Sequence, residues 1–578
     1  MKRRATQEVR VGRVGVGGSN PIRIQSMTIS DTLQTDAVVD EITGLADAGC
    51  EFVRVTTQSL PHAKNLKNIR EGLDARKIDI PLVADIHFSP PTALEAAEWA
   101  DKVRVNPGNF VDPKQFKQRE YTDAEYAEEL TRIEKAFSPF VEKLKTKRRA
   151  LRIGTNHGSL SDRIMNRYGD TPLGMVECAL EYARIAEKFN FHDIIFSMKA
   201  SNPKIMIQAY RLLWEKQTAE GMSYPIHLGV TEAGDGIDAR LKSALGIGTL
   251  LEEGIGDTIR VSLTEPSVAE IPVARAIIKA TQNDYEALQI TSDWKSRRET
   301  ERVQLENGSV GFGKTIAVLD KEVFAQIVEI EKADSLDTAA IDAQKPVAVF
   351  VSGPENEHRP EVLAKELYAA SRKAAEKGLS FIPGFRLSGA SRTLRVYRAF
   401  VDLLEKEKWP IPVVLSIRET GMEEVDAVSA AVGLGSLLCN GIGDAILLND
   451  SDLSFRLLQA SAARITRAEF VACPSCGRTL FDLQETTQKV RSFTHHLKGV
   501  KIAIMGCIVN GPGEMADADF GYVGAAPGKV SLYVGKECIE KNIAQEDAPQ
   551  RLIDLIKSNG KWVEPGVVTA SANTAASL

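Results

Sequence analysis

Short apolar runs alternate with longer amphipathic stretches through the first half of the chain. Each run has the length and the β-branched content of a strand, and each stretch repeats its apolar positions with the period of a helix. Such alternation predicts parallel strands joined by helical crossovers, and eight units within about 260 residues predict a (β/α)8 TIM barrel in an α/β protein. The expected strands are residues 22–27, 52–57, 82–87, 103–106, 151–155, 194–199, 226–231 and 258–263.

Polar residues mark the ends of these expected strands. The carboxyl ends of barrel strands meet at one mouth, so their side chains should gather in one site. The residues are Arg54, Asp85, His87, Arg104, Asn106, Arg152, Asn156, Lys199, Glu232, Arg260 and Ser262.

Five of these residues are cations, and clustered cations are costly to bury unless an anion matches them. Acids are too few in the same motifs to neutralise the cluster. Solvated or ion-paired loop charges are the alternative interpretation. Because arginine suits phosphate oxygens geometrically, the mouth predicts a diphosphate ligand. Glu232, an acid in a basic mouth, is then a candidate proton donor or acceptor.

The middle of the chain repeats part of this barrel at a spacing of 187 residues. The run Gly246-Ile-Gly-Thr-Leu-Leu-Glu-Glu-Gly-Ile-Gly-Asp257 returns as Gly433-Leu-Gly-Ser-Leu-Leu-Cys-Asn-Gly-Ile-Gly-Asp444, and Glu232 returns as Glu419. Agreement over so many spaced positions predicts a duplicated partial barrel.

The copy has fewer expected strands and different strand ends. Residues 315–319, 347–351 and 381–387 bring its count to five, and the charged stretch 293–313 is the expected linker. Arg386, Leu447 and Asn449 stand where the first barrel has Lys199, Arg260 and Ser262. This loss of polar groups predicts a structural spacer.

The seven cysteines divide into two groups. Cys50, Cys178 and Cys439 lie in apolar helical contexts and are expected in the core. Cys473-Pro-Ser-Cys476 and Gly506-Cys-Ile-Val-Asn-Gly-Pro-Gly-Glu514 instead place three thiols in loops of one region. Three readings stay open from spacing alone: an iron–sulfur cluster with one position not held by cysteine, a redox dithiol, or a zinc site whose fourth ligand is Cys538, His495 or His496.

Composition narrows the class of protein. The chain has 578 residues, 43% hydrophobic and 26% charged, with a net charge of −6, which gives no reason to expect a nucleic-acid partner. No apolar run approaches the ~20 residues that span a bilayer, and no signal segment is evident, so a soluble, cytoplasmic protein is expected. We expect the barrel over residues 8–290, the spacer over 291–465, a cysteine-bearing α/β domain over 466–565 and a disordered tail over 566–578.

Several long motifs resemble one enzyme family. They are Arg23-Ile-Gln-Ser-Met27, Val83-Ala-Asp-Ile-His-Phe88, Arg104-Val-Asn-Pro-Gly-Asn109, Thr231-Glu-Ala-Gly234, Gly254-Ile-Gly-Asp-Thr-Ile-Arg-Val-Ser-Leu263 and the two cysteine motifs. Together they resemble the 4-hydroxy-3-methylbut-2-enyl diphosphate synthases, in their long, three-domain form. The resemblance implies reductive ring opening and dehydration of 2-C-methyl-D-erythritol 2,4-cyclodiphosphate, with two electrons from ferredoxin or flavodoxin.

The resemblance also implies roles for residues. A [4Fe-4S] cluster would be held by Cys473, Cys476, Cys507 and Glu514, with Asn510 nearby, and His87 and Glu232 would lie near the reacting carbons. The family usually forms homodimers, and in its long form the spacer would let the cluster domain reach its own barrel. The diphosphate would be held by Arg54, Arg104, Asn106, Arg152, Asn156, Lys199, Arg260 and Ser262.

A rival interpretation keeps the barrel and changes the chemistry. A zinc-stabilised phosphate lyase or aldolase would use the cysteines structurally and Lys199 for a Schiff base.

Overall fold

The computed structural model describes residues 3–86, 89–112, 120–288, 297–305, 308–311, 313–319, 326–337, 339, 341–342, 344–354, 357, 359–474, 476–508, 511–515 and 517–565. The expected tail over 566–578 lies outside these residues. In the described part, no helix is both long enough and apolar enough to cross a membrane.

The first barrel contains the eight parallel strands that the sequence predicts. Their order is β8-β7-β6-β5-β4-β3-β10-β9, and a parallel bridge between Phe196 and Ile226 brings the two ends together. Eight helices surround the sheet: α1 (Thr35–Asp47), α2 (Leu60–Ala75), α3 (Pro90–Trp99), α5 (Asp123–Lys147), α7 (Pro172–Lys188), α8 (Pro203–Ala219), α9 (Gly236–Glu252) and α10 (Glu270–Thr281). The strands are β3 (Arg23–Met27), β4 (Phe52–Thr56), β5 (Leu82–Ile86), β6 (Lys102–Val105), β7 (Ala150–Asn156), β8 (Ile194–Lys199), β9 (His227–Leu228) and β10 (Thr258–Ile259).

A short hairpin closes the amino end of this barrel. Strands β1 (Val9–Val11) and β2 (Val14–Val16) pair antiparallel, and their valines pack against Phe52, Val83, Ala150 and Ile195 inside the barrel. The apolar side chains of the hairpin therefore cover this end of the barrel.

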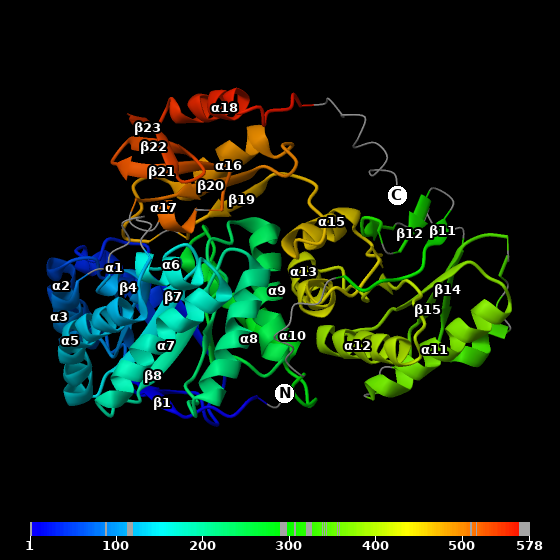
Figure 1. Cartoon of the computed structure of the whole chain (residues 1–578), viewed down its shortest axis with the longest axis horizontal. Coiled ribbons are helices and arrows are strands. Elements are labelled where there is room, and N and C mark those ends of the chain that lie inside the picture. Colours follow the sequence, from blue (N-terminus) through cyan, green and yellow to red (C-terminus); the bar gives the residue numbers. More distant parts are fainter. Residues whose placement is uncertain are drawn as a thin grey trace.

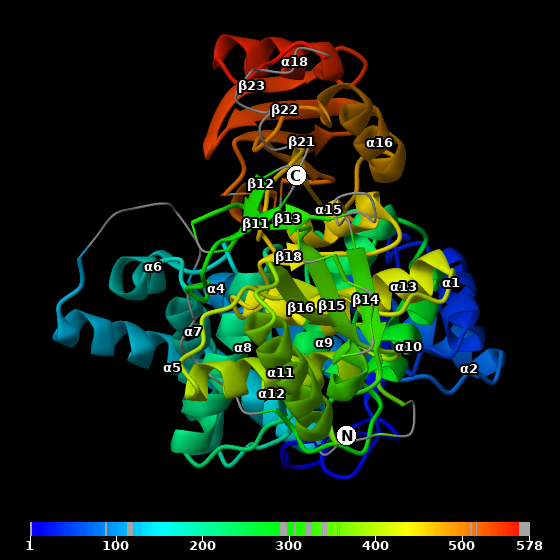
Figure 2. The ribbon, with the colours of Figure 1, turned by 90° about the vertical axis from the view of Figure 1, so that its right-hand side faces the viewer.

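The second barrel is an open sheet of six parallel strands, so the prediction of five strands is wrong. The missed strand is β14 (Gln326–Ile330), where only Ile330 is fully buried. Figure 2 shows this sheet from the side opposite the first barrel. Its order is β13 (Ala317–Val318), β18 (Ala445–Ile446), β17 (Val414–Leu415), β16 (Phe381–Phe385), β15 (Val347–Val351) and β14.

The expected linker 293–313 carries structure of its own. Strands β11 (Val303–Leu305) and β12 (Gly308–Val310) form a hairpin, and Leu305 and Val310 pack against Phe350 and Leu447 inside the second sheet. This hairpin stands in the same relation to its sheet as β1 and β2 do to theirs. The duplication therefore includes the closing hairpin.

The two barrels meet through equivalent helices. α9 packs against the continuous helix formed by α13 (Glu423–Ala430), the π turn Ala431–Gly435 and α14 (Ser436–Cys439). The hydroxyls of Thr249 and Ser436, which are 187 residues apart, lie 2.7 Å from each other. A Cβ on Gly248 would lie 2.5 Å from Val432, and one on Gly435 would lie 2.8 Å from Leu245. Since 435 and 432 are the repeats of 248 and 245, the contact is reciprocal, like an isologous dimer interface.

The C-terminal domain lies over the carboxyl end of the first barrel, while the second barrel lies beside it (Figure 1). Two helices, α16 (Leu483–Thr494) and α18 (Ala548–Ser558), pack on its sheet. A bridge between Ala233 and Ala472 and an ion pair of 2.7 Å between Arg491 and Asp235 join it to the barrel. Its five strands are β19 (Glu469–Ala472), β20 (Lys501–Met505), β21 (Phe520–Ala526), β22 (Lys529–Val534) and β23 (Glu537–Ala544).

Candidate active site

A pocket of ≈ 620 Å³ lies between the mouth of the first barrel and the C-terminal domain. The barrel contributes the five cations expected from the strand ends, and the C-terminal domain contributes three cysteines and Arg478. The structure therefore brings the two groups of candidate residues together within one chain. The cations are Arg54, Arg104, Arg152, Lys199 and Arg260.

Two carboxylates partly neutralise these cations. Asp85 lies 3.0 Å from Arg104 and 3.9 Å from Arg54, and Glu270 lies 3.0 Å from Arg260. Glu270 comes from α10 and was missed by the sequence analysis, which looked for acids only in the strand-end motifs. The prediction that the mouth holds too few acids to neutralise its cations is thus correct only in part, because three of the five cations form ion pairs with Asp85 or Glu270.

Arg152 and Lys199 are the two cations of the five that take no part in these ion pairs. The side chain of Arg152 is fully buried, and none of its three guanidinium nitrogens has a hydrogen-bond partner in the described structure. Burial, and then the charges of Arg54 and Arg104, lower the pKa of Arg152 well below its ordinary value. Burial, followed by Arg260 and Arg152, does the same to the pKa of Lys199. Buried cations of this kind are stabilised by an anion that accepts their hydrogen bonds.

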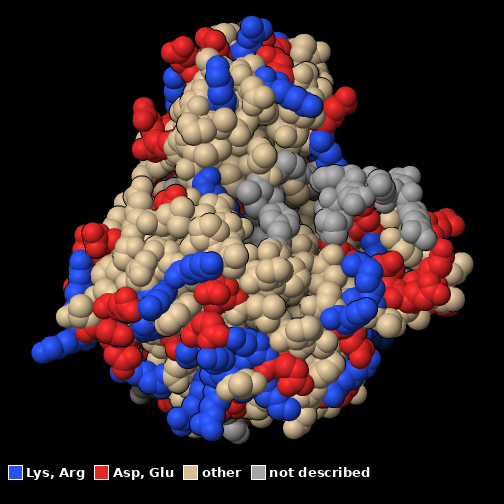
Figure 3. All heavy atoms as spheres, turned by 90° about the vertical axis from the view of Figure 1, so that its left-hand side faces the viewer, with Lys and Arg blue, Asp and Glu red and all other residues tan. Residues whose placement is uncertain are grey.

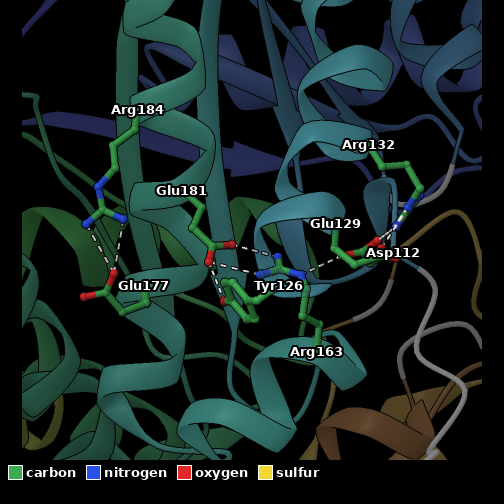
Figure 4. A network of polar contacts seen from close by, with 8 residues as sticks. All are labelled: Asp112, Tyr126, Glu129, Arg132, Arg163, Glu177, Glu181 and Arg184. Carbon is green, nitrogen blue, oxygen red and sulfur yellow. Dashed lines mark hydrogen bonds and ion pairs between the residues drawn. The ribbon is translucent and has the colours of Figure 1, made fainter. Parts of the chain in front are cut away.

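Arg163 shows how the same barrel satisfies a buried arginine that has a structural role. Its guanidinium lies 2.7 Å from Glu181 and 3.2 Å from Asp112, and Glu181 also accepts from Tyr126 (Figure 4). The network ties α5, α6 (Asp162–Tyr168) and α7 together. The contrast with Arg152 indicates that the donors of Arg152 are kept for a ligand.

Arg478 is a second residue that the sequence analysis missed. It lines the pocket two residues after Cys476, and its Nε and Nη1 are buried without a hydrogen-bond partner in the described structure. It acts on Cys476: burial raises the pKa of that thiol, but the charge of Arg478 and the hydrogen bonds from its backbone and side chain together leave the pKa below its usual value. An arginine directly after a Cys-x-x-Cys-Gly turn was the available signal.

The three thiols of Cys473, Cys476 and Cys507 line the same pocket. No three His, Cys, Asp or Glu side chains of the described residues are close enough to hold a metal ion as they stand. The donor set is nevertheless soft and convergent, which suits an iron–sulfur cluster.

The fourth ligands that a zinc site would need lie elsewhere. Cys538 is on β23, and its thiol lies 3.7 Å from the carbonyl of Glu540. The ring of His496 contacts the carbonyl of Val563, and the ring of His495 lies nearly perpendicular to it at 5.8 Å between centroids. None of these side chains is among the described residues that line the pocket. The arrangement therefore gives the zinc interpretation no support.

Glu232 lies in this pocket in a strained conformation. Its φ is +49°, which is unusual for a residue other than glycine, and its side chain is buried. The hydroxyl of Thr231 donates to its carboxylate at 2.6 Å. Strain at a buried acid is typical of functional sites, where the surrounding structure holds the group in place.

The other expected residues divide into three groups. Asn156 lines the pocket and accepts from Arg104 at 3.2 Å. Asn106 caps α4 (Pro107–Phe110), and neither it nor the buried Ser262 is among the described lining residues. The third group, which comprises His87, Asn510 and the side chain of Glu514, lies outside the described structure.

In the part of the second barrel that the structure describes, apolar residues stand at two positions of this cluster. Ile382 is the repeat of Ile195, at the spacing of 187 residues. Ala348 pairs with Ile382 and Arg152 pairs with Ile195, so Ala348 is the counterpart of Arg152. Leu447, the counterpart of Arg260, is buried in an apolar core.

Fold and pocket together define a class: a TIM-barrel enzyme with a cationic mouth, covered by a thiol-bearing domain of the same chain. A family model described as the GcpE TIM-barrel domain matches residues 6–275, and one described as the GcpE protein C-terminal domain matches residues 469–558. The chain belongs to the GcpE family.

Relatives of nearly full length support this assignment. A protein of Akkermansia muciniphila is 49% identical over 97% of this chain and 98% of its own, and one of Protochlamydia amoebophila is 44% identical over 98% of both. Both are named 4-hydroxy-3-methylbut-2-en-1-yl diphosphate synthase (flavodoxin). A rice protein, 43% identical over 98% of this chain and 88% of its own, is named as the chloroplastic ferredoxin form.

Solved structures are more distant. A truncated 3-deoxy-D-arabino-heptulosonate 7-phosphate synthase from Thermotoga maritima covers 47% of this chain and 90% of its own, at 13% identity and a TM-score of 0.30. A similarity this low supports no argument about function.

Proposed function

We propose that this chain converts 2-C-methyl-D-erythritol 2,4-cyclodiphosphate into 4-hydroxy-3-methylbut-2-enyl diphosphate with two electrons. The observation that carries the proposal is the pocket itself, where a buried guanidinium without partners faces three thiols across one cavity. The names of the relatives in two bacteria and in rice point to the same reaction.

The diphosphate is held by the cations of the barrel mouth. Arg152 supplies buried donors that no described residue accepts, Lys199 adds a second buried cation, and Arg54 and Arg260 line the same pocket. Asp85 and Glu270 fix the orientation of their arginine partners, so the pocket is shaped before the ligand arrives. Asn156 lines the same pocket, and Asn106 and Ser262 are buried but are not among its described lining residues.

The thiols of Cys473, Cys476 and Cys507 are the residues that would hold a [4Fe-4S] cluster, with the Glu514 carboxylate as fourth ligand. When bound, such a cluster supplies electrons one at a time. Thiolates held for this purpose suit a reducing compartment, in keeping with the proposed cytoplasmic location. The homodimer predicted from the sequence stays a prediction.

The balance of the reaction assigns a task to Glu232. Two carbon–oxygen bonds break, one carbon–carbon double bond forms, and two electrons and two protons are consumed as water leaves. Asp85 and Glu232 are the buried acids among the described lining residues, and Asp85 is held in an ion pair with Arg104. We therefore assign to Glu232 the delivery of a proton to the departing hydroxyl. We expect His87 to lie near the same carbons.

Metal content and turnover test the proposal directly. Anaerobically purified protein should be brown, contain iron and sulfide, and convert the cyclodiphosphate when dithionite is the reductant. A colourless protein that contains zinc and still acts on a phosphorylated substrate would favour the lyase or aldolase instead. A brown protein without turnover would remove the proposed substrate but keep the cluster.

A further inference from the structure

A second cavity, of ≈ 840 Å³, lies on the outer side of the thiols. Its walls come from two loops at the barrel mouth, through Ile29, Asp31 and Gln58, and from the C-terminal domain. Cys476, Arg478 and Cys507 line both this groove and the inner pocket. These three residues therefore form a wall with the proposed substrate on one side and solvent on the other.

The rim of the groove is apolar and exposed. Ile29 is 38% exposed and Ile508 is 53% exposed, and both line the groove. Leu33, at 48%, and Leu60, at 41%, lie two residues from the lining residues Asp31 and Gln58. Of the ten large hydrophobic side chains found exposed in the described structure, two therefore line the groove and two more follow its lining residues closely in sequence.

Charged groups are few at this place. The described lining residues include only Asp31 and the partly buried Arg478 as charged groups. On the face that Figure 3 shows, charged side chains are sparse in the band between the C-terminal domain above and the lower part of the barrel. A contact here gains from apolar burial more than from charge attraction.

We propose that this groove is the docking surface of a small flavoprotein of the flavodoxin class. The inference rests on the proposed function, because electrons must then reach the thiols from outside while substrate occupies the inner pocket. The exposed dimethylbenzene edge of a flavin is apolar and fits an apolar rim. The two relatives with the highest identity given above are named for flavodoxin.

The electron balance requires two encounters in each turnover. In each encounter a fully reduced flavin would lose one electron and become a semiquinone, and a cluster held by Cys473, Cys476 and Cys507 would be the acceptor that this electron reduces. Two donor molecules therefore supply the two electrons that the substrate consumes, and solvent supplies the protons. A small, brief contact suits such encounters, which are typical of redox partners.

Charge substitutions of both signs at Leu33 test the surface. Leu33 lies in a loop and is half exposed, so Leu33→Asp and Leu33→Arg should leave the fold intact. Each variant should raise the KM for a purified, fully reduced flavodoxin by roughly tenfold, because each buries a charge against an apolar partner. Turnover driven by dithionite, which needs no docking surface, should stay unchanged. Ile539→Asp and Ile539→Arg, on β23 and 46% exposed, are matched controls that should alter neither assay.

Each other outcome overturns the inference in its own way. An unchanged KM for flavodoxin would place docking elsewhere, and opposite effects of Asp and Arg would show a contact guided by charge. An effect with reduced ferredoxin alone would exclude the flavoprotein as occupant. If the unaltered chain fails to turn over with dithionite, the proposed function fails, and that result is distinct from a failure of the docking surface.

Discussion

Replacing Arg152 by Met should stabilise the ligand-free protein and abolish most of its affinity for the diphosphate. The guanidinium is fully buried, has no hydrogen-bond partner in the described structure, and is repelled by Arg54 and Arg104. Methionine fills a similar length of the cavity without charge. Ordinary packing arguments would predict the opposite sign for the loss of a large buried side chain.

The magnitudes follow from the two roles of the side chain. Replacing a buried, unbalanced charge by an apolar group stabilises by ~1–4 kcal/mol, and each kcal/mol shifts Tm by about 2–4 °C in a domain of this size. Charge-assisted hydrogen bonds contribute ~1.5–3 kcal/mol each, so losing two of them weakens binding by roughly 10²–10⁴-fold.

Thermal unfolding without ligand and calorimetric titration with the cyclodiphosphate measure both effects. Arg163→Met is the matched control, since Arg163 is a buried arginine of the same barrel that is paired with Glu181 and Asp112 (Figure 4). It should lower Tm, because breaking a buried pair costs ~3–5 kcal/mol. A lower Tm for Arg152→Met, or unchanged binding, would refute the assignment of Arg152 to an anion.

Further substitutions address three groups: the proton donor, the second cation and the fourth ligand. Glu232→Gln should lower turnover by ~10²–10⁴-fold with Tm nearly unchanged, while Glu419→Gln, on the barrel without the cation cluster, should keep turnover; equal losses in both would give the second barrel a share in the chemistry. Because the pKa of Lys199 is lowered in the ligand-free pocket and an anion raises it, binding should take up a proton, and affinity should fall as the pH rises from the free to the bound pKa. Titrations in buffers of different ionisation enthalpy measure this uptake, which Lys199→Met should remove. Glu514→Cys should give a more robust cluster with little turnover, and Glu514→Ala a labile one that still binds diphosphate; spectroscopy that shows a fourth sulfur in the unaltered protein would exclude the carboxylate.

The strands of the first barrel were predictable because buried parallel strands are nearly continuous apolar runs. Strand β14 was not, because Gln326 and Glu329 interrupt its apolar positions and it lies at the open edge of the second sheet. The closing hairpins were missed because strands of three residues leave too short a pattern. Their place becomes clear only from the apolar interior that they cover.

The residues of the site also divide into those that the sequence could predict and those that it could not. The five cations of the first mouth follow from strand ends, since fold topology alone brings those ends together. Glu270 and Arg478 do not, because their approach depends on how α10 and the C-terminal domain pack against the mouth. Sequence pattern carries the direction of a strand, but not the tertiary packing that pairs Arg260 and leaves Arg152 unpaired.

The reciprocal contact between α9 and its repeat has a consequence for assembly. Two separate barrels that met through this surface would part on dilution, because their pairing would depend on concentration. Here one polypeptide carries both halves. The contacts of Gly248 with Val432 and of Gly435 with Leu245 therefore form at an effective concentration that is set by the chain alone. The C-terminal domain follows the second barrel in sequence and is thereby anchored beside the first. A single molecule, however dilute, keeps its thiols over its own cationic mouth.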